Sequence, residues 1–366
     1  MSNLLKDMYS PEALRKVALD LQSVYPPFQV EEFLISIFDE TWDSLELKAR
    51  GRHICMCLGK YLPSDYPEAI SIIDKVIVNY GNWLDGIFYM FFLDFVEVFG
   101  QDEIHWDISI GAMERYTTHE SAEFAVRPFI INHENRMMAQ MYAWAKHENE
   151  HVRRLASEGC RPALPWAQAI PSFKKDPTPV LPILEELKND PSEWVRRSVA
   201  NNLNDISKTH PELVVKIAKK WYGQNELLDW VVKHGCRTLL KKGNRDALAL
   251  FGYSDVTSVD MSNFAFEKTS ISIGDDLTFS FSIHTKTQTK VRLEYAVDYV
   301  KSKGKRSRKI FKISEITLKE NEKKGYTRKH SFADVSVRKH YPGTHSITLI
   351  INGVECESLD FELLKS

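Results

Sequence analysis

The spacing of apolar residues separates an earlier helical part of the chain from a later part built of short strands. Before about residue 251, apolar residues recur three and four positions apart, which is the period of a helix with one buried face. The segments 10–23, 67–78 and 181–187 show this spacing clearly. We therefore expect helices over these segments.

After 251–259 the period of the pattern becomes two. Apolar and polar residues alternate over 277–283 and 291–299, which is typical of strands with one buried face. Asn352-Gly353 separates two further strand-like runs, and this dipeptide favours the type I′ turn of a hairpin because both central residues need positive φ. About seven short strands over roughly 110 residues predict an immunoglobulin-like β-sandwich. Because Cys356 is its single cysteine, this part lacks the disulfide of antibody domains.

Length and composition support two domains. A chain of 366 residues exceeds the usual size of a single hydrophobic core. All 8 tryptophans and 14 of the 15 prolines precede residue 255. We therefore expect a helical domain over 1–254 and a β-domain over 255–366.

The helical part contains a repeat. The segment 151–158 (HVRRLASE) is similar to 194–201 (WVRRSVAN) and to 230–237 (WVVKHGCR), with offsets of 43 and then 36 residues. Such periods are typical of stacked helical repeats, although chance similarity of short helices is the alternative. The predicted fold class is mainly α, a HEAT-like α-solenoid followed by an all-β immunoglobulin-like sandwich.

The charge of the chain is unevenly distributed. The formal net charge is −2, but 286–339 holds 17 basic and 6 acidic residues, which leaves 31 basic and 44 acidic residues elsewhere. The β-domain is therefore a basic module on an acidic protein. The run 303–309 reads as a hairpin loop whose cations would reach a nucleic-acid backbone; a solvated loop is the alternative. The cationic residues proposed for that contact are Lys303, Lys305, Arg306 and Arg308.

Several classes of protein are disfavoured. No apolar stretch approaches the roughly 20 residues that span a bilayer, and no apolar leader follows a basic start. Five scattered cysteines fit a reducing cytosol better than a disulfide framework. Cys55 and Cys57 have no second pair at zinc-finger spacing. We expect a soluble, cytoplasmic protein without a metal or cofactor and without a membrane partner.

The repeated helices each predict one apolar and one polar face. In the first copy Val152 and Leu155 share a side, opposite Arg154 and Glu158, with Arg161 following. The corresponding outward residues of the later copies are Arg197, Asn201, Asn204, Asp205, Lys233 and Arg237. A solvated face is the ordinary alternative for any single helix. Stacked, these faces would form one polar surface, which solenoids use for extended ligands.

A tryptophan lies beside the first copy. The segment 161–166 (RPALPW) holds two prolines and ends at Trp166, which would either pack in the core or offer a stacking surface. Arginine neutralises phosphate, asparagine both donates and accepts hydrogen bonds, and aromatic rings stack on bases. This combination favours DNA as the ligand.

The chain resembles a known family. The segments 121–129 (SAEFAVRPF), 151–167 and 192–205 are similar to those of the AlkC branch of the DNA alkylation repair proteins, relatives of AlkD, and the resemblance extends over essentially the whole chain. It implies a monofunctional glycosylase that removes cationic N3-alkylated bases, 3-methyladenine and 3-methylcytosine, from duplex DNA without a base-flipping pocket. It also implies that Glu123, Glu158 and Asp205 are the catalytic carboxylates. We expect the protein to act as a monomer.

The chemistry gives these carboxylates a role. A cationic base is already a good leaving group, so the demand falls on the sugar, which becomes oxocarbenium-like as the bond breaks. A nearby carboxylate stabilises that charge and can orient water. The structural alternatives are pairing of Glu158 with Arg154 or Arg161, pairing of Glu123 with Arg127, and a helix-end role for Asp205.

Two other functions remain open from the sequence. A non-catalytic HEAT-repeat scaffold would bind DNA or protein through the same face. A metal-dependent nucleic-acid enzyme would need clustered carboxylates, and the nearest pair, Asp275-Asp276, lies in the β-domain, outside the repeat segments. Outward carboxylates would repel phosphates, which argues against a simple DNA binder.

Overall fold

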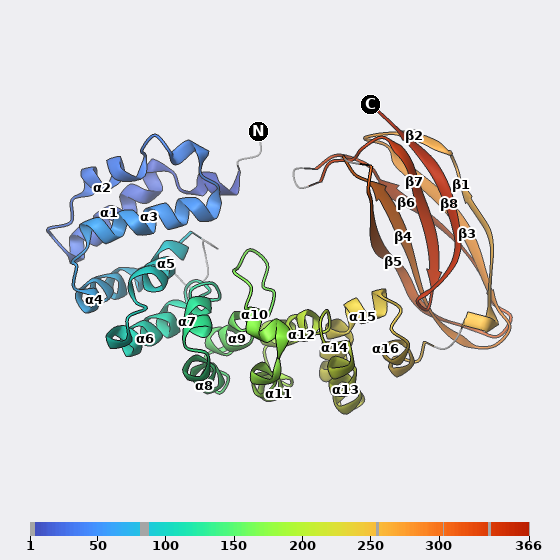
Figure 1. The fold of residues 1–366 in the computed structure, drawn as a ribbon, viewed down its shortest axis with the longest axis horizontal. Coiled ribbons are helices and arrows are strands. Elements are labelled where there is room, and N and C mark those ends of the chain that lie inside the picture. Colours follow the sequence, from blue (N-terminus) through green and yellow to red (C-terminus); the bar gives the residue numbers. More distant parts are fainter. Residues whose placement is uncertain (1–3, 81–87, 254–255, 303, 336–337, 366) are drawn as a thin grey trace. The chain divides into compact units, whose positions relative to one another are not determined.

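The computed structural model describes residues 4–80, 88–253, 256–302, 304–335 and 338–365 (Figure 1). They form two compact units. The first holds the described residues up to Thr209 together with Gly223–Gly235, and the second holds His210–Tyr222 and the described residues from Cys236 onward. The predicted domain boundary between residues 254 and 255 lies outside the described ranges and stays a prediction.

The described residues of the first unit form helices joined by turns and loops, with no strand among them. Its α-helices are α1 (Pro11–Val24), α2 (Val30–Ile37), α3 (Leu47–Tyr61), α4 (Tyr66–Ile77), α5 (Met90–Phe99), α6 (Trp106–Tyr116), α7 (Val126–Asn132), α8 (Glu134–Trp144), α9 (Glu150–Gly159), α10 (Pro171–Lys175), α11 (Leu181–Leu187), α12 (Glu193–Ile206) and α14 (Glu226–Gly235). Short 3₁₀ turns are η1 (Leu5–Met8), η2 (Trp42–Ser44), η3 (Glu103–His105) and η4 (Thr178–Val180).

The three helices expected from apolar spacing are confirmed. The predicted segments 10–23, 67–78 and 181–187 correspond to α1, α4 and α11. The Ser10 hydroxyl caps α1 by accepting the Ala13 amide, and the Asp65 carboxylate caps α4 by accepting the Glu68 amide. A capping side chain and one apolar face thus accompany α1 and α4, whereas α11 has no side-chain cap.

The three similar segments fall on α9, α12 and the α14–α15 region, and α12 packs against both α9 and α14. Polar contacts join the first two copies inside the packed interface. The Ser157 and Ser198 hydroxyls are 2.7 Å apart, and the Asn202 side chain donates to the Ser157 carbonyl at 2.8 Å. Equivalent helices of the repeat are thus stacked next to each other.

The first arginine of the Val-Arg-Arg motif has the same structural role in both copies. Arg153 Nη1 donates to the carbonyls of His147 and Glu148, six and five residues earlier. Arg196 Nη1 donates to the carbonyls of Asp190 and Pro191, again six and five residues earlier. These contacts fix the turn that leads into each repeated helix.

The second unit combines three short helices with an all-β domain. Its helical segments are α13 (Pro211–Trp221), α15 (Arg237–Lys241), α16 (Arg245–Leu250) and the 3₁₀ turn η5 (Val256–Ser258). Its strands are β1 (Val259–Phe266), β2 (Ser270–Ser272), β3 (Asp276–Thr285), β4 (Thr289–Val300), β5 (Arg306–Leu318), β6 (Lys323–Ser331), β7 (Gly343–Ile351) and β8 (Val354–Leu364).

The strands form two sheets, in the orders β1-β3-β6 and β2-β8-β7-β4-β5. All pairs are antiparallel except β2 with β8. The predicted hairpin at Asn352-Gly353 is confirmed, because these residues join β7 to β8 with φ of +46° and +78°. About seven short strands were expected; the described residues form eight, of which β4 and β5 are long, at 12 and 13 residues.

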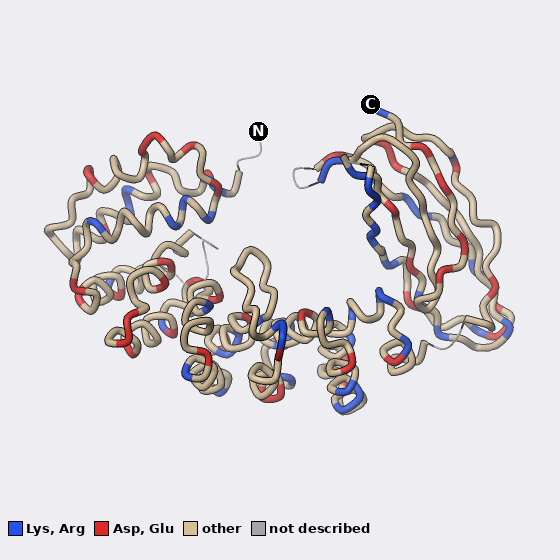
Figure 2. The backbone as a smooth tube through the Cα atoms, viewed as in Figure 1, with Lys and Arg blue, Asp and Glu red and all other residues tan. Residues whose placement is uncertain are grey.

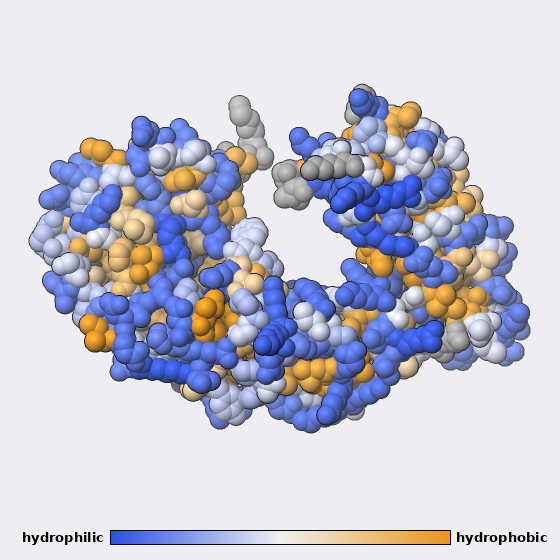
Figure 3. Space-filling model, in the orientation of Figure 1, coloured by the Kyte–Doolittle hydropathy of each residue, from blue (hydrophilic) through white to orange (hydrophobic). Residues whose placement is uncertain are grey.

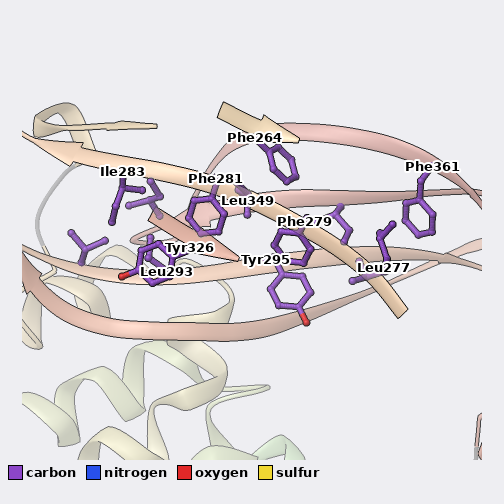
Figure 4. Close-up of a cluster of buried hydrophobic side chains, with 14 of the residues drawn as sticks. Phe264, Leu277, Phe279, Phe281, Ile283, Leu293, Tyr295, Tyr326, Leu349 and Phe361 are labelled. Atoms are coloured by element: carbon purple, nitrogen blue, oxygen red, sulfur yellow. The ribbon is translucent and has the colours of Figure 1, made fainter. Parts of the chain in front are cut away.

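One hydrophobic cluster fills the space between the two sheets (Figure 4). Phe279 and Phe281 of β3 face it from the smaller sheet, and Leu293 and Leu349 from the larger. The alternation predicted for β3 holds, but both faces of β4 are buried. Its second face includes Arg292, which is buried with its ion-pair partner Glu294 at 2.6 Å, so a polar residue there does not signal exposure.

A buried histidine makes the β-domain sensitive to acid. Tyr295 Oη lies 2.9 Å from Nδ1 of His330 and Tyr299 Oη lies 2.6 Å from its Nε2. Burial lowers the pKa of His330 to about 4, with help from the positive charges of Arg338 and His340. The neutral ring therefore stabilises the fold fully above the unfolded pKa of 6.5, and this contribution is lost as pH falls through 4.

We predict that the free energy of unfolding of the β-domain falls by about 3 kcal/mol between pH 7 and pH 4 on account of this residue, at 1.36 kcal/mol per pKa unit. Amide hydrogen exchange in β3 and β4 measures the change. His330→Phe should remove most of the pH dependence. An unchanged dependence in that variant would assign the acid sensitivity to other groups.

No helix in the described part of the chain is long and apolar enough to cross a membrane. On the face drawn in Figure 3, hydrophilic residues cover most of each unit and hydrophobic residues are scattered between them.

Candidate active site

A pocket of about 310 Å³ lies in the helical unit. It collects side chains from four segments far apart in the sequence: α5, the turn between α6 and α7, α9, and the loop between α9 and α10. The lining residues are Met90, Glu120, Ser121, Glu123, Phe124, Arg154, Glu158, Arg161, Leu164, Pro165 and Trp166. Two of the three predicted catalytic carboxylates, Glu123 and Glu158, are therefore in one pocket.

The third carboxylate is joined to the pocket by alternating charges. Arg154 Nη1 donates to Glu123 Oε2 at 2.8 Å, and Arg154 Nη2 lies 3.8 Å from Glu158 Oε1. Arg161 Nη1 donates to Glu158 Oε1 at 2.5 Å, and its Nε donates to Asp205 Oδ2 at 2.8 Å. Lys208 Nζ completes the series by donating to Asp205 Oδ1 at 2.8 Å. We call Glu123, Arg154, Glu158, Arg161, Asp205 and Lys208 the ion-pair chain.

The carboxylates of Glu158 and Asp205 are placed by the ends of two packed helices. Glu158 lies in the last turn of α9 and Asp205 in the last turn of α12, so the packing of these two helices brings both carboxylates to Arg161. Arg154, one turn before Glu158, lies over the Trp194 ring with 4.9 Å between guanidinium carbon and ring centroid. The packing of the repeated helices α9 and α12 therefore brings these side chains together.

Two carboxylates of the ion-pair chain and a neighbouring asparagine are much more buried than the sequence suggested. Helical periodicity predicted that Glu158, Asn204 and Asp205 face outward, but they are 5%, 4% and 3% exposed. The prediction of exposure was wrong because these residues lie near helix ends, where neighbouring segments cover them. Burying several charges costs free energy unless each has a partner, and each carboxylate here has a cationic partner.

The sequence offered ion pairing as an alternative to a catalytic role for Glu158 and Glu123. Glu158 does pair with Arg161 and lies near Arg154, as that alternative predicted. Glu123 pairs with Arg154, whereas Arg127 donates to the carbonyls of Gly159 and Gln168 instead. Arg127 is 1% exposed and fixes the end of α9 to the loop that follows it.

Trp166 does not pack in the core. It is 70% exposed at the wall of the pocket, in the loop between α9 and α10 (Figure 1), and its φ of +63° is unusual for a bulky residue. Its carbonyl accepts from Lys48 Nζ at 2.8 Å, and the same ammonium lies 4.0 Å from the centroid of the Phe124 ring. This conformation presents the indole ring outward, as stacking requires.

The remaining predicted residues of the helical part lie away from the pocket lining. Arg197 is exposed and pairs with Glu193 at 2.6 Å. Asn201, Lys233 and Arg237 are half-buried. Nothing in their environment tests a role in DNA binding.

The basic run of the β-domain is partly strand. The turn between β4 and β5 ends at Lys305, and Arg306 and Arg308 already pair with β4, so a hairpin loop over the whole run was wrong. Lys305, Arg306 and Arg308 are exposed, while Lys303 lies outside the described residues. Lysine and arginine recur along β5 in Figure 2. Arg306 donates to Ser346 and Arg308 pairs with Glu355, so these cations are held above the sheet.

Sequence reasoning missed several groups at the site. Lys48 is 118 residues from Trp166, and no local pattern links them. Lys208 could have been found from its spacing of three residues from Asp205, although it lies in the turn just after α12. Glu120 could have been noticed as a second carboxyl three residues before Glu123. Within the described ranges, no three His, Cys, Asp or Glu side chains form a group that could hold a metal ion.

Comparison with known proteins agrees with this architecture. The family model described as "DNA alkylation repair enzyme" matches residues 113–246, and that of the YhaZ C-terminal Ig-like domain matches residues 260–365. The curated protein YhaZ of Bacillus subtilis (strain 168) is 48% identical over 359 residues, which cover 98% of this chain and 99% of YhaZ.

A solved structure extends the match to three dimensions. The alkylpurine DNA glycosylase AlkC of Pseudomonas fluorescens, bound to DNA containing an abasic-site analogue, is similar with a TM-score of 0.92 and 34% identity over 99% of each chain. A helical region followed by an Ig-like domain, matched along its whole length, defines a DNA alkylation repair protein. The chain belongs to the AlkC family and carries the YhaZ type of C-terminal domain.

Proposed function

We propose that this protein is a monofunctional DNA glycosylase that hydrolyses the N-glycosidic bond of alkylated bases in duplex DNA, with 3-methyladenine and 3-methylcytosine as substrates. The observation that carries the proposal is the ion-pair chain, which joins three carboxylates from two repeated helices and one turn, two of them, Glu123 and Glu158, in the lining of one pocket. The similarity to an alkylpurine glycosylase over the whole chain supports it.

In the proposed mechanism the carboxylates act on the sugar. The alkylated base leaves without an acid because it is already cationic. Positive charge then develops on the deoxyribose, where Glu158 and Glu123 stabilise it and orient the attacking water, and Asp205 acts through Arg161. Arg154 and Arg161 keep the carboxylates in place and offer donors to the phosphate or sugar, while Trp166 stacks beside the lesion.

The proposed release of the base needs no pocket for a flipped base. Pockets for flipped bases stack the base between aromatic or apolar side chains. Here two arginines and three carboxyl groups share the pocket lining with apolar and aromatic side chains. We also propose that the helical region is a HEAT-like α-solenoid in which Asn201, Arg197, Lys233 and Arg237 contact DNA, and that the protein acts as a monomer. The burial of Asn204 argues against the contact predicted for it.

The test of the proposal is release of free base. The full-length protein is incubated in EDTA with duplex DNA that contains 3-methyladenine, and the released base is measured against spontaneous loss. We expect release above the spontaneous rate. No release would favour a non-catalytic DNA-binding or protein-binding scaffold, and release only after addition of metal would favour a metal-dependent enzyme.

The basic β-domain should make DNA affinity strongly dependent on salt. Five or six phosphate contacts predict that the logarithm of the association constant falls against the logarithm of salt concentration with a slope of about −5, at about 0.9 per contact. Lys305→Gln is expected to reduce the slope by about one. Lys268→Gln, an exposed lysine between β1 and β2, is the control and should leave it unchanged. An affinity that does not change with salt would contradict phosphate binding.

A further inference from the structure

The third carboxyl group of the pocket lining has no role in the mechanism above. Glu120 is one of the lining residues and is only 4% exposed. Its Oε1 accepts the Ser121 amide at 2.9 Å, whereas its Oε2 is buried with no hydrogen-bond partner among the described residues. A buried carboxyl oxygen without a partner is costly, and a water molecule or ligand that forms a hydrogen bond to it removes that cost.

The surroundings of Glu120 oppose its ionisation. Burial, with a smaller contribution from the negative charge of Glu123, raises its pKa to about 8, although the Ser121 amide and the Arg154 guanidinium act to lower it. Glu120 in turn acts on Tyr9. Burial and the charges of Asp94 and Glu120 raise the pKa of the Tyr9 hydroxyl, and burial raises that of Asp94 to about 6.

Near neutral pH, Glu120 is therefore an acid rather than a carboxylate. The oxygen that accepts the Ser121 amide is the carbonyl-like one, so the proton lies on Oε2 and this atom becomes a hydrogen-bond donor. Glu123, by contrast, accepts from the Ser121 hydroxyl and from Arg154, both at its Oε2. Its Oε1 remains to accept a proton from a water molecule.

We propose that Glu120 is a positioning residue that works in its neutral form, donating a hydrogen bond from Oε2 to the attacking water while Glu123 accepts a hydrogen bond from that water. Two contacts, one donated and one accepted, fix the orientation of a water molecule and leave a lone pair for the sugar carbon. Two adjacent carboxyl groups thus divide the work because their environments differ. This inference rests on the proposed function.

Glu120 also shapes the turn that carries Glu123. The Ser121 amide is held by Glu120, and the Ser121 hydroxyl both donates to Glu123 and accepts from Arg154 at 3.1 Å. Ionisation of Glu120 would remove the donor and place a second negative charge beside Glu123. Base release should therefore decline as pH rises through about 8.

The experiment measures single-turnover base release from 3-methyladenine DNA between pH 6 and pH 9.5, at saturating protein, for the wild type and variants. Glu120→Gln keeps a neutral donor, so we expect a loss of about threefold at pH 7 and no decline through pH 8. Glu120→Leu keeps the bulk without the donor and should lose about 30-fold at every pH. Glu193→Gln, an exposed carboxyl on α12, is the control and should keep the wild-type profile.

A second measurement follows the protonation of Glu120 without activity. The carbon-13 shift of its side-chain carboxyl, assigned by its absence in Glu120→Gln, should titrate at about 8. Thermal melts check that each variant is folded. The proposal is overturned if Glu120→Gln loses as much as Glu120→Leu, or if its activity declines through pH 8 as in the wild type.

The two proposals fail in different ways. A protein whose Glu120 titrates at about 8 but which releases no base at any pH contradicts the glycosylase function, and the positioning role with it. A protein that releases base while Glu120 titrates near 4.5 contradicts the positioning role alone, because a carboxylate at neutral pH has no proton to donate.

Discussion

Replacing Glu158 by glutamine is expected to slow base release by about 10²–10⁴-fold while the affinity for DNA changes by less than about threefold, since electrostatic stabilisation acts on the transition state rather than on bound DNA. Glutamine preserves the shape of the side chain. Arg154 and Arg161 keep their other partners, Glu123 and Asp205, so the pocket should stay assembled.

Single-turnover rates of 3-methyladenine release measure the first quantity, and titration of DNA containing an abasic-site analogue measures the second. Glu193→Gln is the matched control, because Glu193 pairs with an arginine in the same way but on the exposed surface of α12. Equal losses of rate and affinity in Glu158→Gln would show that Glu158 is a structural or DNA-contact residue, and the carboxylate mechanism would have to be abandoned.

Replacing Arg161 by methionine is expected to destabilise the helical unit by about 3 kcal/mol, because it removes the cation that Glu158 and Asp205 share and leaves them only Arg154 and Lys208. Arg161 is 7% exposed and bridges Glu158 and Asp205, which are buried as deeply. Methionine fills much of the space of the arginine stem, so the loss reports mainly on the charge.

Denaturant unfolding followed by tryptophan fluorescence measures this loss in the helical part, since all 8 tryptophans precede residue 255. Arg197→Met is the control. Its ion pair with Glu193 is exposed and should contribute at most about 1 kcal/mol. Neutralising the carboxylates together with Arg161, by Glu158→Gln and Asp205→Asn, should recover stability but not activity. If the free energy of unfolding falls no more in Arg161→Met than in Arg197→Met, Glu158 and Asp205 do not depend on Arg161 for their stabilisation.

Local patterns predicted those parts of the fold that depend on neighbouring residues. The helix after Ser10 has its cap and its apolar face within one segment, and the hairpin at Asn352-Gly353 is determined by two residues with positive φ. The period of the repeat likewise appears in the packed helices α9, α12 and α14. These features need no knowledge of what packs against them.

Burial and distant contacts could not be predicted in the same way. A helical wheel treats the face opposite the apolar residues as exposed, yet the end of α12 is covered and Asp205 is buried. The contact of Lys48 with the Trp166 carbonyl joins residues 118 positions apart. The resemblance to a family identified Glu123, Glu158 and Asp205, but only the packed structure shows that arginines separate them and that Glu120 stands beside them.

The two arginines of the Val-Arg-Arg motif have different roles, one conserved between the two copies of the repeat in this chain and one not. Arg153 and Arg196 each donate hydrogen bonds to the turn before their own helix, so both copies of the motif stabilise that turn in the same way. The second arginine of the motif does not contact this turn. In the first copy it is Arg154, which lines the pocket and pairs with Glu123, and in the second copy it is Arg197, which is exposed. The same motif therefore supports the fold in both copies, whereas its second arginine joins the ion-pair chain only in the first.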